Sequence, residues 1–210
     1  NQFRSGLSAF SDIFQKLNLV ANLSGGSIKV YALLTLHRPA NVDNKKSLIK
    51  ILNALKIISG EIPIIFPIHP RTRKMVAEFE LEKYFHFHSN KAEGPINLSN
   101  SINTINPLGY LDFLALMSKA KLVLTDSGGI QEETTVLGIP CITLRDTTER
   151  PITINEGTNV LVHNETEKII NEAMKVLNGK KDKGKCPEMW DGRTAERIID
   201  ILVRNVIRKI

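Results

Sequence analysis

The chain is poor in residue types that mark several classes of protein. Its 210 residues include only two cysteines, Cys141 and Cys186, and aromatic residues make up 6% of the sequence. Two cysteines so far apart form neither a disulfide framework nor a zinc-binding spacing, which favours a reducing compartment. The sequence has no apolar run long enough to span a membrane and no signal-peptide pattern. We therefore expect a cytoplasmic protein with no metal, no cofactor and no membrane partner.

Three common catalytic motifs are also missing. The sequence has no Gly-x-x-x-x-Gly-Lys-Ser/Thr loop, no Gly-x-Gly-x-x-Gly fingerprint and no Gly-x-Ser-x-Gly elbow. These absences argue against a P-loop enzyme, a standard dinucleotide-binding enzyme and a serine hydrolase.

The chain is basic, with a net charge of +6 at pH 7 and an isoelectric point near 9.3. Part of this charge lies in solvated runs at residues 180–185 and 204–209. A basic balance suits an anionic ligand and leaves nucleic acid as an alternative partner. Because the few aromatic residues do not interleave with a basic stripe, we expect no nucleic-acid partner.

Strand and helix patterns alternate along the chain and are joined by short links. Apolar segments predict strands at residues 28–36, 63–68, 101–105, 121–125, 140–144 and 159–162. Amphipathic segments predict helices at about 8–19, 43–59, 72–79, 110–117, 165–177 and 194–207, the second ending at Gly60. This alternation is typical of a Rossmann-like α/β fold, in which helices cover both faces of a parallel sheet. Ligands of such sheets bind beyond the carboxyl ends of the strands.

The most informative segment is TDSGGIQEE at residues 125–133. It joins a buried strand to a helix, so free backbone N–H groups and the positive end of a helix dipole point at one place. A phosphate is the natural occupant of such a place. Ser127 adds a hydroxyl donor, Gly128 and Gly129 let a diphosphate approach, and the paired glutamates can accept hydrogen bonds from ribose hydroxyls. The segment predicts a nucleotide site, and the alternative is a glycine-rich helix cap.

Other polar residues follow neighbouring strands and should lie at the same edge of the sheet. His37 and Arg38 come before a proline that favours extended backbone, and both can bind a phosphate. His69 has the same position after the second strand. Arg150 lies in the polar loop RDTTERP, as an anion clamp or a loop anchor, and Phe113 is a core residue or a support for a base. The alternative for His37 and Arg38 is a capped turn, and for His69 it is a rigid turn with a structural histidine. The alternative for the RDTTERP loop is an ion-pair network that holds the loop closed.

Taken in order, several motifs resemble the UDP-N-acetylglucosamine 2-epimerase family. The last of them resembles the family's closing helix. The motifs are TLHR at 35–38, PLGY at 107–110, TDSGGIQEE at 125–133, RDTTERP at 145–151 and GRTAERI at 192–198.

The resemblance spans about residues 28–205 and implies one half of a GT-B fold, which has two Rossmann-like domains. Residues 1–210 would be the C-terminal, UDP-binding domain, with a core at about 20–190 and a closing helix at 192–208. The N-terminal domain would be absent from this chain.

The family's UDP contacts can be transferred to matching positions. The resemblance assigns the diphosphate to Ser127, Gly128 and Gly129. It assigns the ribose to Glu133 and the uracil to Phe113.

The resemblance also gives roles to residues in other loops. His37 would face the phosphates as the candidate catalytic residue of this chain, and Arg150 would support the site. His69 falls where some bacterial members bind a second, regulatory nucleotide sugar. Pro39-Ala40 replaces the Arg-Glu of many members, which makes the regulatory contacts less secure than the UDP contacts.

The implied activity is the non-hydrolysing interconversion of UDP-GlcNAc and UDP-ManNAc, by elimination and re-addition of UDP without a cofactor. The family's acid/base carboxylates lie in the absent domain, so we expect this fragment to bind UDP weakly and to turn over nothing. The full-length protein would be a homodimer. The alternatives are a hydrolysing 2-epimerase that releases UDP and ManNAc, and a GT-B glycosyltransferase, which the RDTTERP motif disfavours. The exact sugar, UDP-GlcNAc or a uronic-acid version, stays open.

Overall fold

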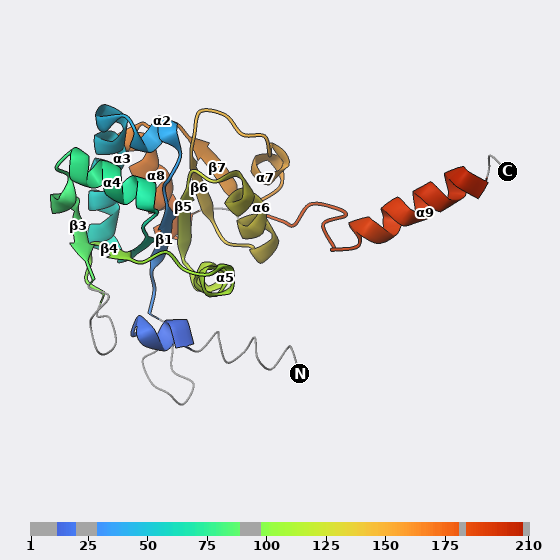
Figure 1. The fold of residues 1–210 in the computed structure, drawn as a ribbon, viewed down its shortest axis with the longest axis horizontal. Coiled ribbons are helices and arrows are strands. Elements are labelled where there is room, and N and C mark those ends of the chain that lie inside the picture. The colour runs from blue at the N-terminus through green and yellow to red at the C-terminus, as the bar shows by residue number, and fades with distance from the viewer. Residues whose placement is uncertain (1–11, 20–28, 89–97, 181–183, 208–210) are drawn as a thin grey trace.

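A parallel sheet forms the centre of the protein (Figure 1). The computed structural model describes residues 12–19, 29–88, 98–180 and 184–207. In these residues seven strands lie in the order β3-β4-β2-β1-β5-β6-β7, and every pair is parallel. Their bounds are β1 Ala32–Thr35, β2 Ile64–Pro67, β3 Phe85–Phe87, β4 Ile102–Ile105, β5 Leu122–Thr125, β6 Cys141–Leu144 and β7 Asn159–Val162. The predicted Rossmann-like α/β fold is confirmed.

Helices connect most of the successive strands, and residues 89–97, between β3 and β4, lie outside the described part. Residues 12–16 are helical, and the start of the predicted helix at 8–19 lies outside the described residues. The bounds of the others are α2 Pro39–Val42, α3 Lys45–Glu61, α4 Pro70–Glu78, α5 Tyr110–Lys119, α6 Gly128–Leu137, α7 Ile152–Asn155, α8 Thr166–Leu177 and α9 Thr194–Ile207, with a 3₁₀ turn at Glu82–Tyr84. Within the described ranges, no helix combines the length and the apolar character that crossing a bilayer requires.

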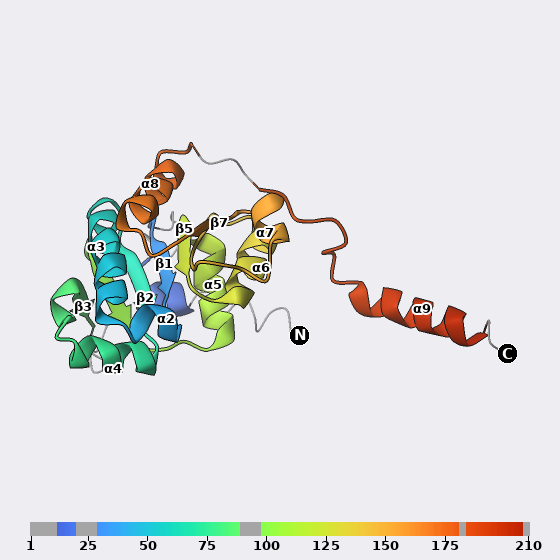
Figure 2. The same cartoon turned by 90° about the horizontal axis from the view of Figure 1, so that it is seen from above.

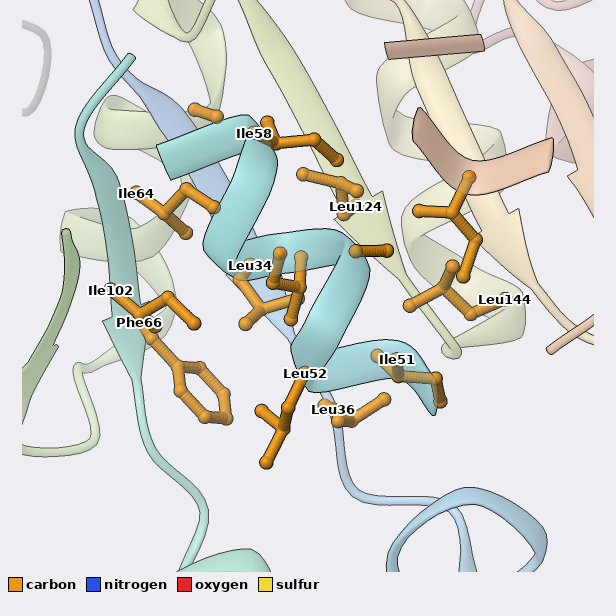
Figure 3. Close-up of a cluster of buried hydrophobic side chains, with 14 of the residues drawn as sticks. Leu34, Leu36, Ile51, Leu52, Ile58, Ile64, Phe66, Ile102, Leu124 and Leu144 are labelled. Atoms are coloured by element: carbon orange, nitrogen blue, oxygen red, sulfur yellow. The ribbon is translucent and has the colours of Figure 1, made fainter. Parts of the chain in front are cut away.

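The central strands β1, β2, β4, β5 and β6 are buried on both faces of the sheet, to which their side chains point alternately. On one face Leu34, Phe66 and Leu124 pack against α3, as Figure 3 shows. On the other face Leu33 and Val123 join a second cluster, which includes residues of α5. Strands buried on both faces appear in a sequence as continuous apolar runs, which explains why the predicted strands showed little alternation.

Two local predictions differ from the structure. The first strand begins at Ala32 rather than at residue 28, which lies outside the described part. Gly60 does not end α3: the helix continues to Glu61, and the N–H of Ile62 still donates to the Ile58 carbonyl. A helix tolerates an exposed glycine near its end at a cost of about 1 kcal/mol.

Two short helices, α2 and α7, were not predicted. In α2, Pro39 occupies the first turn, where its fixed φ suits a helix and its missing N–H does no harm. The following helix, α3, has a side-chain cap: Asn44 accepts a hydrogen bond from the Ser47 N–H.

The strand order changes direction between β1 and β5. From β1 the sheet extends through β2 and β4 to β3, and from β5 it extends through β6 to β7. In open parallel sheets, the loops that leave two such neighbouring strands separate to opposite sides and leave a crevice at the carboxyl ends. That crevice lies between His37 and Ser127, which follow β1 and β5.

The last helix, α9, stands apart from the sheet in two perpendicular views (Figures 1 and 2). One of its faces is apolar and exposed to solvent. The exposed fractions are 52% for Ile198, 60% for Ile199, 58% for Ile201, 58% for Leu202 and 49% for Val203.

Candidate functional site

The N-terminus of α6 leaves its first-turn N–H groups without a side-chain cap. Ser127 has extended backbone (φ −84°, ψ 137°), and its side chain caps none of the N–H groups of α6. The first turn contains no acidic residue. Gly129 is exposed, and a Cβ at this position would meet no atom within 4 Å. The first-turn N–H groups and the positive end of the helix dipole therefore face solvent.

Two guanidinium groups flank this helix end. A Cβ placed on Gly128 would lie 3.8 Å from Arg145 Nη1 and 3.9 Å from Arg38 Nη2. It would also lie 3.9 Å from Glu149 Oε2. An anion at Gly128 would thus lie near two cations and the Glu149 carboxylate; Arg38 was a predicted site residue, and Arg145 was expected only as part of the polar loop 145–151.

Arg145 is held by an acidic neighbour. Its Nη1 and Nη2 donate to the two carboxylate oxygens of Glu149 at 2.9 and 2.7 Å, and its side chain is 11% exposed. The Arg145 hydrogen bond lowers the pKa of the Glu149 carboxyl to about 2. Glu149 therefore stays ionised at physiological pH, and it shields Arg145 from other anions.

Asp126 ties the β1 loop to the β5 loop. Its carboxylate is fully buried and accepts hydrogen bonds from the His37 N–H at 3.0 Å and from the Arg38 N–H at 2.8 Å. The Asn41 side chain adds a third at 3.2 Å. The Arg38 side chain also donates to the Asp126 backbone carbonyl at 3.0 Å. Sequence analysis gave Asp126 no role, although it lies within the TDSGG motif.

A cavity of about 240 Å³ brings four predicted site residues together. His37, His69, Phe113 and Ser127 all line it. The His37 and His69 rings are tilted to each other, with centroids 5.7 Å apart. The other lining residues are Thr35, Leu36, Pro67, Pro107, Leu108 and Ile130.

Glu133 lines a different cavity, of about 390 Å³, together with Tyr110, Leu114 and Trp190. Its Oε2 atom is buried and has no hydrogen-bond partner within the described ranges. Burial, and to a lesser extent the charge of Glu132, raises the pKa of Glu133. A ligand that donates hydrogen bonds to this carboxylate would offset the free-energy cost of its burial.

Arg150 is engaged with α6 itself. Its Nε lies 3.0 Å from Glu132 Oε1, and its Nη1 donates to the Glu149 carbonyl. This geometry fits the loop-anchor interpretation better than an anion clamp, because the guanidinium already has a carboxylate partner.

Gln131 is a second residue that sequence reasoning missed. It is fully buried, and its amide donates to the Ser127 carbonyl at 3.2 Å. Its Oε1 accepts from Thr148 at 2.6 Å and from Asn159 at 3.1 Å. Gln131 thus fixes the loop after β6 against the start of α6. The available signal in the sequence was the single amide residue of the TDSGGIQEE motif.

Among the residues that the structure describes, no cluster of three or more potential metal ligands occurs.

These features define a Rossmann-like domain with an uncapped helix N-terminus at its topological switch point. A family model described as UDP-N-acetylglucosamine 2-epimerase matches residues 9–203. The chain belongs to this family.

Individual relatives agree with this assignment. The chain is 47% identical over 174 residues to a UDP-N-acetylglucosamine 2-epimerase of Methanocaldococcus jannaschii, covering 82% of this chain and 44% of that protein. It is 33% identical over 175 residues to a UDP-2,3-diacetamido-2,3-dideoxy-D-glucuronate 2-epimerase of Pseudomonas aeruginosa, covering 83% and 44%.

A solved structure gives the same result for the fold. The crystal structure of the M. jannaschii UDP-GlcNAc 2-epimerase in complex with UDP-GlcNAc and UDP matches with a TM-score of 0.72 and 41% identity. The match covers 96% of this chain and 49% of that one. The domain therefore corresponds to one half of the GT-B fold, and it spans about half the length of its relatives.

Proposed function

We propose that this chain is the UDP-binding half of a non-hydrolysing UDP-GlcNAc 2-epimerase. The observation that carries the proposal is the N-terminus of α6, here called its mouth, where uncapped N–H groups lie beside Arg38 and Arg145. Family membership supplies the ligand: the related M. jannaschii structure is described as a complex with UDP-GlcNAc and UDP.

We assign the diphosphate to Ser127, Gly128 and Gly129, at the mouth of the helix. The cavity that Ser127 shares with His37 and Phe113 supports a diphosphate near the histidine and a uracil near the aromatic ring. This is the arrangement expected from the sequence.

Glu133 would accept hydrogen bonds from the ribose hydroxyls, which its unpartnered oxygen supports. Arg150 would act indirectly, by holding the loop after β6 through Glu132. His69, on the same cavity as His37, stays the candidate regulatory contact.

The proposed reaction has two balanced steps. Removal of the C2 proton forms the C1=C2 double bond, and the electron pair of the C1–O bond leaves with UDP. Return of a proton to the opposite face of C2 and of the UDP oxygen to C1 gives the epimer. This domain would stabilise the charge of the departing diphosphate through N–H groups and cations. The acid/base carboxylates would belong to the half that the chain lacks, so the fragment should bind UDP without turnover.

The missing half would also cover α9. This helix exposes an apolar face, and the chain spans only 44% of the M. jannaschii relative. We propose that the N-terminal half packs on this face of α9, which lies within the expected closing helix 192–208. The homodimer and the cytoplasmic location expected from the sequence stay predictions.

The sugar specificity has one specific alternative. The relative of P. aeruginosa is named for a diacetamido-glucuronate. The complete enzyme would show this alternative by epimerising the uronate and leaving UDP-GlcNAc unchanged.

Calorimetry with UDP tests the binding half of the proposal. Wild type should bind UDP with a dissociation constant of about 10 μM to 1 mM, and Ser127→Trp should abolish the signal, since the indole would fill the helix mouth. A matched control is Ser99→Trp: Ser99 is exposed and precedes β4, at the amino edge of the sheet. No binding by wild type, or equal binding by Ser127→Trp, would refute the assignment. Turnover is then measured with the complete gene product, where UDP-ManNAc without free ManNAc is expected.

A further inference from the structure

The side chain of His37 is held from one side by a buried carboxylate. His37 Nδ1 lies 3.1 Å from Asp126 Oδ1, and the exposed fractions of the two side chains are 41% and 0%. The ring therefore turns Nδ1 toward Asp126, and His37 also lines the cavity that includes Ser127. Nε2 makes no hydrogen bond to any residue that the structure describes.

The hydrogen bonds of Asp126 determine which partner donates. The His37 N–H approaches both carboxylate oxygens, at 3.2 and 3.0 Å, and the Arg38 N–H approaches Oδ2 at 2.8 Å. A carboxylate that accepts from backbone N–H groups at both oxygens acts as an acceptor. Nδ1 must then carry the proton. In a neutral ring, Nε2 would hold only a lone pair, so the ring could donate to a phosphate only when it is doubly protonated.

We propose that Asp126 is a positioning residue for His37: it fixes Nδ1 as the inner donor and turns Nε2 to the ligand, so that His37 serves a diphosphate only as the imidazolium. The role toward a diphosphate rests on the proposed function, whereas the ring orientation and the tautomer do not. No comparison assigns a role to Asp126.

The groups around His37 shift its pKa in opposite directions. The hydrogen bond from Asp126 raises the pKa of His37, while partial burial and the Arg38 guanidinium oppose this rise. From α4, the His69 ring faces His37 at 5.7 Å, and from the start of α6 the neutral Ser127 lines the same cavity. The net direction is upward, so the imidazolium persists to a higher pH than in an exposed histidine. Its contribution to stability is complete below pH 6.5 and is lost as the pH rises through the folded pKa.

The first test reads the tautomer directly. Long-range ¹H–¹⁵N correlation spectra of the 210-residue chain resolve its five histidines, and His37→Gln assigns the signal. Near about pH 9, wild type should show the Nδ1–H form of His37. In Asp126→Asn, the amide oxygen can replace Oδ2 for the Arg38 N–H while the amide NH₂ faces Nδ1. We expect the Nε2–H form and a lower pKa of His37 in this variant.

A second His–Asp pair gives the matched control. His163 Nδ1 lies 2.9 Å from Asp146 Oδ1, with exposed fractions of 50% and 81%. Asp146→Asn should leave the tautomer and the pKa of His37 unchanged. A neutral His37 of the Nε2–H form in wild type would overturn the proposal, even if Asp126→Asn failed to fold.

The second test measures the binding of UDP-GlcNAc against pH. Its diphosphate is esterified at both ends and lacks the ionisation near about pH 6 of a terminal phosphate. Between about pH 6.5 and 9, wild-type affinity should fall about fivefold to tenfold as Nε2 loses its proton. Asp126→Asn should show a flatter profile, because its neutral ring keeps an Nε2–H donor.

The outcomes separate the two proposals. A wild-type affinity that is independent of pH would overturn the role of His37 as an imidazolium. Failure of wild type to bind UDP-GlcNAc at any pH would refute the proposed function, and the tautomer measurement would still decide the orientation of His37.

Discussion

The mouth of α6 and the helix α9 lie far apart in the structure, and each exposes groups that folded proteins usually cover. At α6 the exposed groups are polar: first-turn N–H groups beside Arg38 and Arg145. At α9 they are apolar side chains, such as Leu202, which is 58% exposed.

The difference indicates two kinds of missing partner. Polar groups aimed at one place suit a small anion, because a few directed hydrogen bonds satisfy them. A long apolar face suits another protein surface, since only a surface of similar size can cover it. We therefore assign α6 to the ligand and α9 to the half that the chain lacks.

The largest expected effect is on the melting temperature, and it should differ between this fragment and the complete protein. Leu202→Asp should change the melting temperature of this fragment by less than about 1 °C, because the side chain is already exposed. In the complete protein it would bury a charge and should lower the melting temperature by about 5 °C or more. Asp200→Asn, on the polar face of α9, should have no effect in either. Equal melting of wild type and Leu202→Asp in the complete protein would contradict the proposed covering of α9.

The next effect concerns the mouth of α6. In Gly128→Ala the new Cβ makes ordinary contacts of 3.8–3.9 Å, so the fold should persist. The methyl group would stand where the diphosphate meets the N–H groups, and UDP affinity measured by calorimetry should fall about tenfold. The control is Gly60→Ala, on α3, where a Cβ would meet no atom within 4 Å. Loss of affinity in both variants would show that the effect is not specific to the site.

A smaller effect is expected from Glu149. Its carboxylate holds Arg145 and lies near Gly128, so an incoming diphosphate must compete with it. Glu149→Gln should tighten UDP binding about threefold to fivefold, because Arg145 becomes available to the ligand. Glu165→Gln, which removes an exposed partner of Lys168 on α8, should leave affinity unchanged. Weaker binding by Glu149→Gln would mean that the carboxylate positions Arg145 rather than shielding it.

The smallest effect is on stability at Glu133. Its pKa is raised in the folded state, so ionisation destabilises the fold as the pH rises above 4.5. Glu133→Gln should raise the melting temperature by about 2 °C at pH 7 and by less near pH 4, where the carboxyl is already protonated. Thermal melts at both values test this. Glu132→Gln, which loses the ion pair with Arg150, should give no gain.

Much of the fold could be read from the sequence. The six strands expected from apolar runs are all present, because strands buried on both faces leave long continuous signals. Short elements were missed: α2 and α7 have four residues each, too few to show a helical period. The short strand Phe85–Phe87 gave only a weak signal, from its alternating histidines.

The structure brings some of the predicted site residues together. His37, Phe113, Ser127 and His69 meet at one cavity, as their positions after or before strands suggested. Glu133 lies on a neighbouring cavity instead. Its place depends on how α5 packs beside α6, which a linear motif does not specify.

By itself, the sequence determined most of the elements and the glycine-rich start of α6 at Ser127–Gly129, because periodicity, helix ends and glycine act over a few residues. Only the tertiary structure decided that β1 lies beside β5, which brings His37 to Asp126, 89 residues away in the chain. The pairing of parallel strands is non-local, so the residues that orient the histidine and flank the helix mouth become neighbours only when the sheet is assembled.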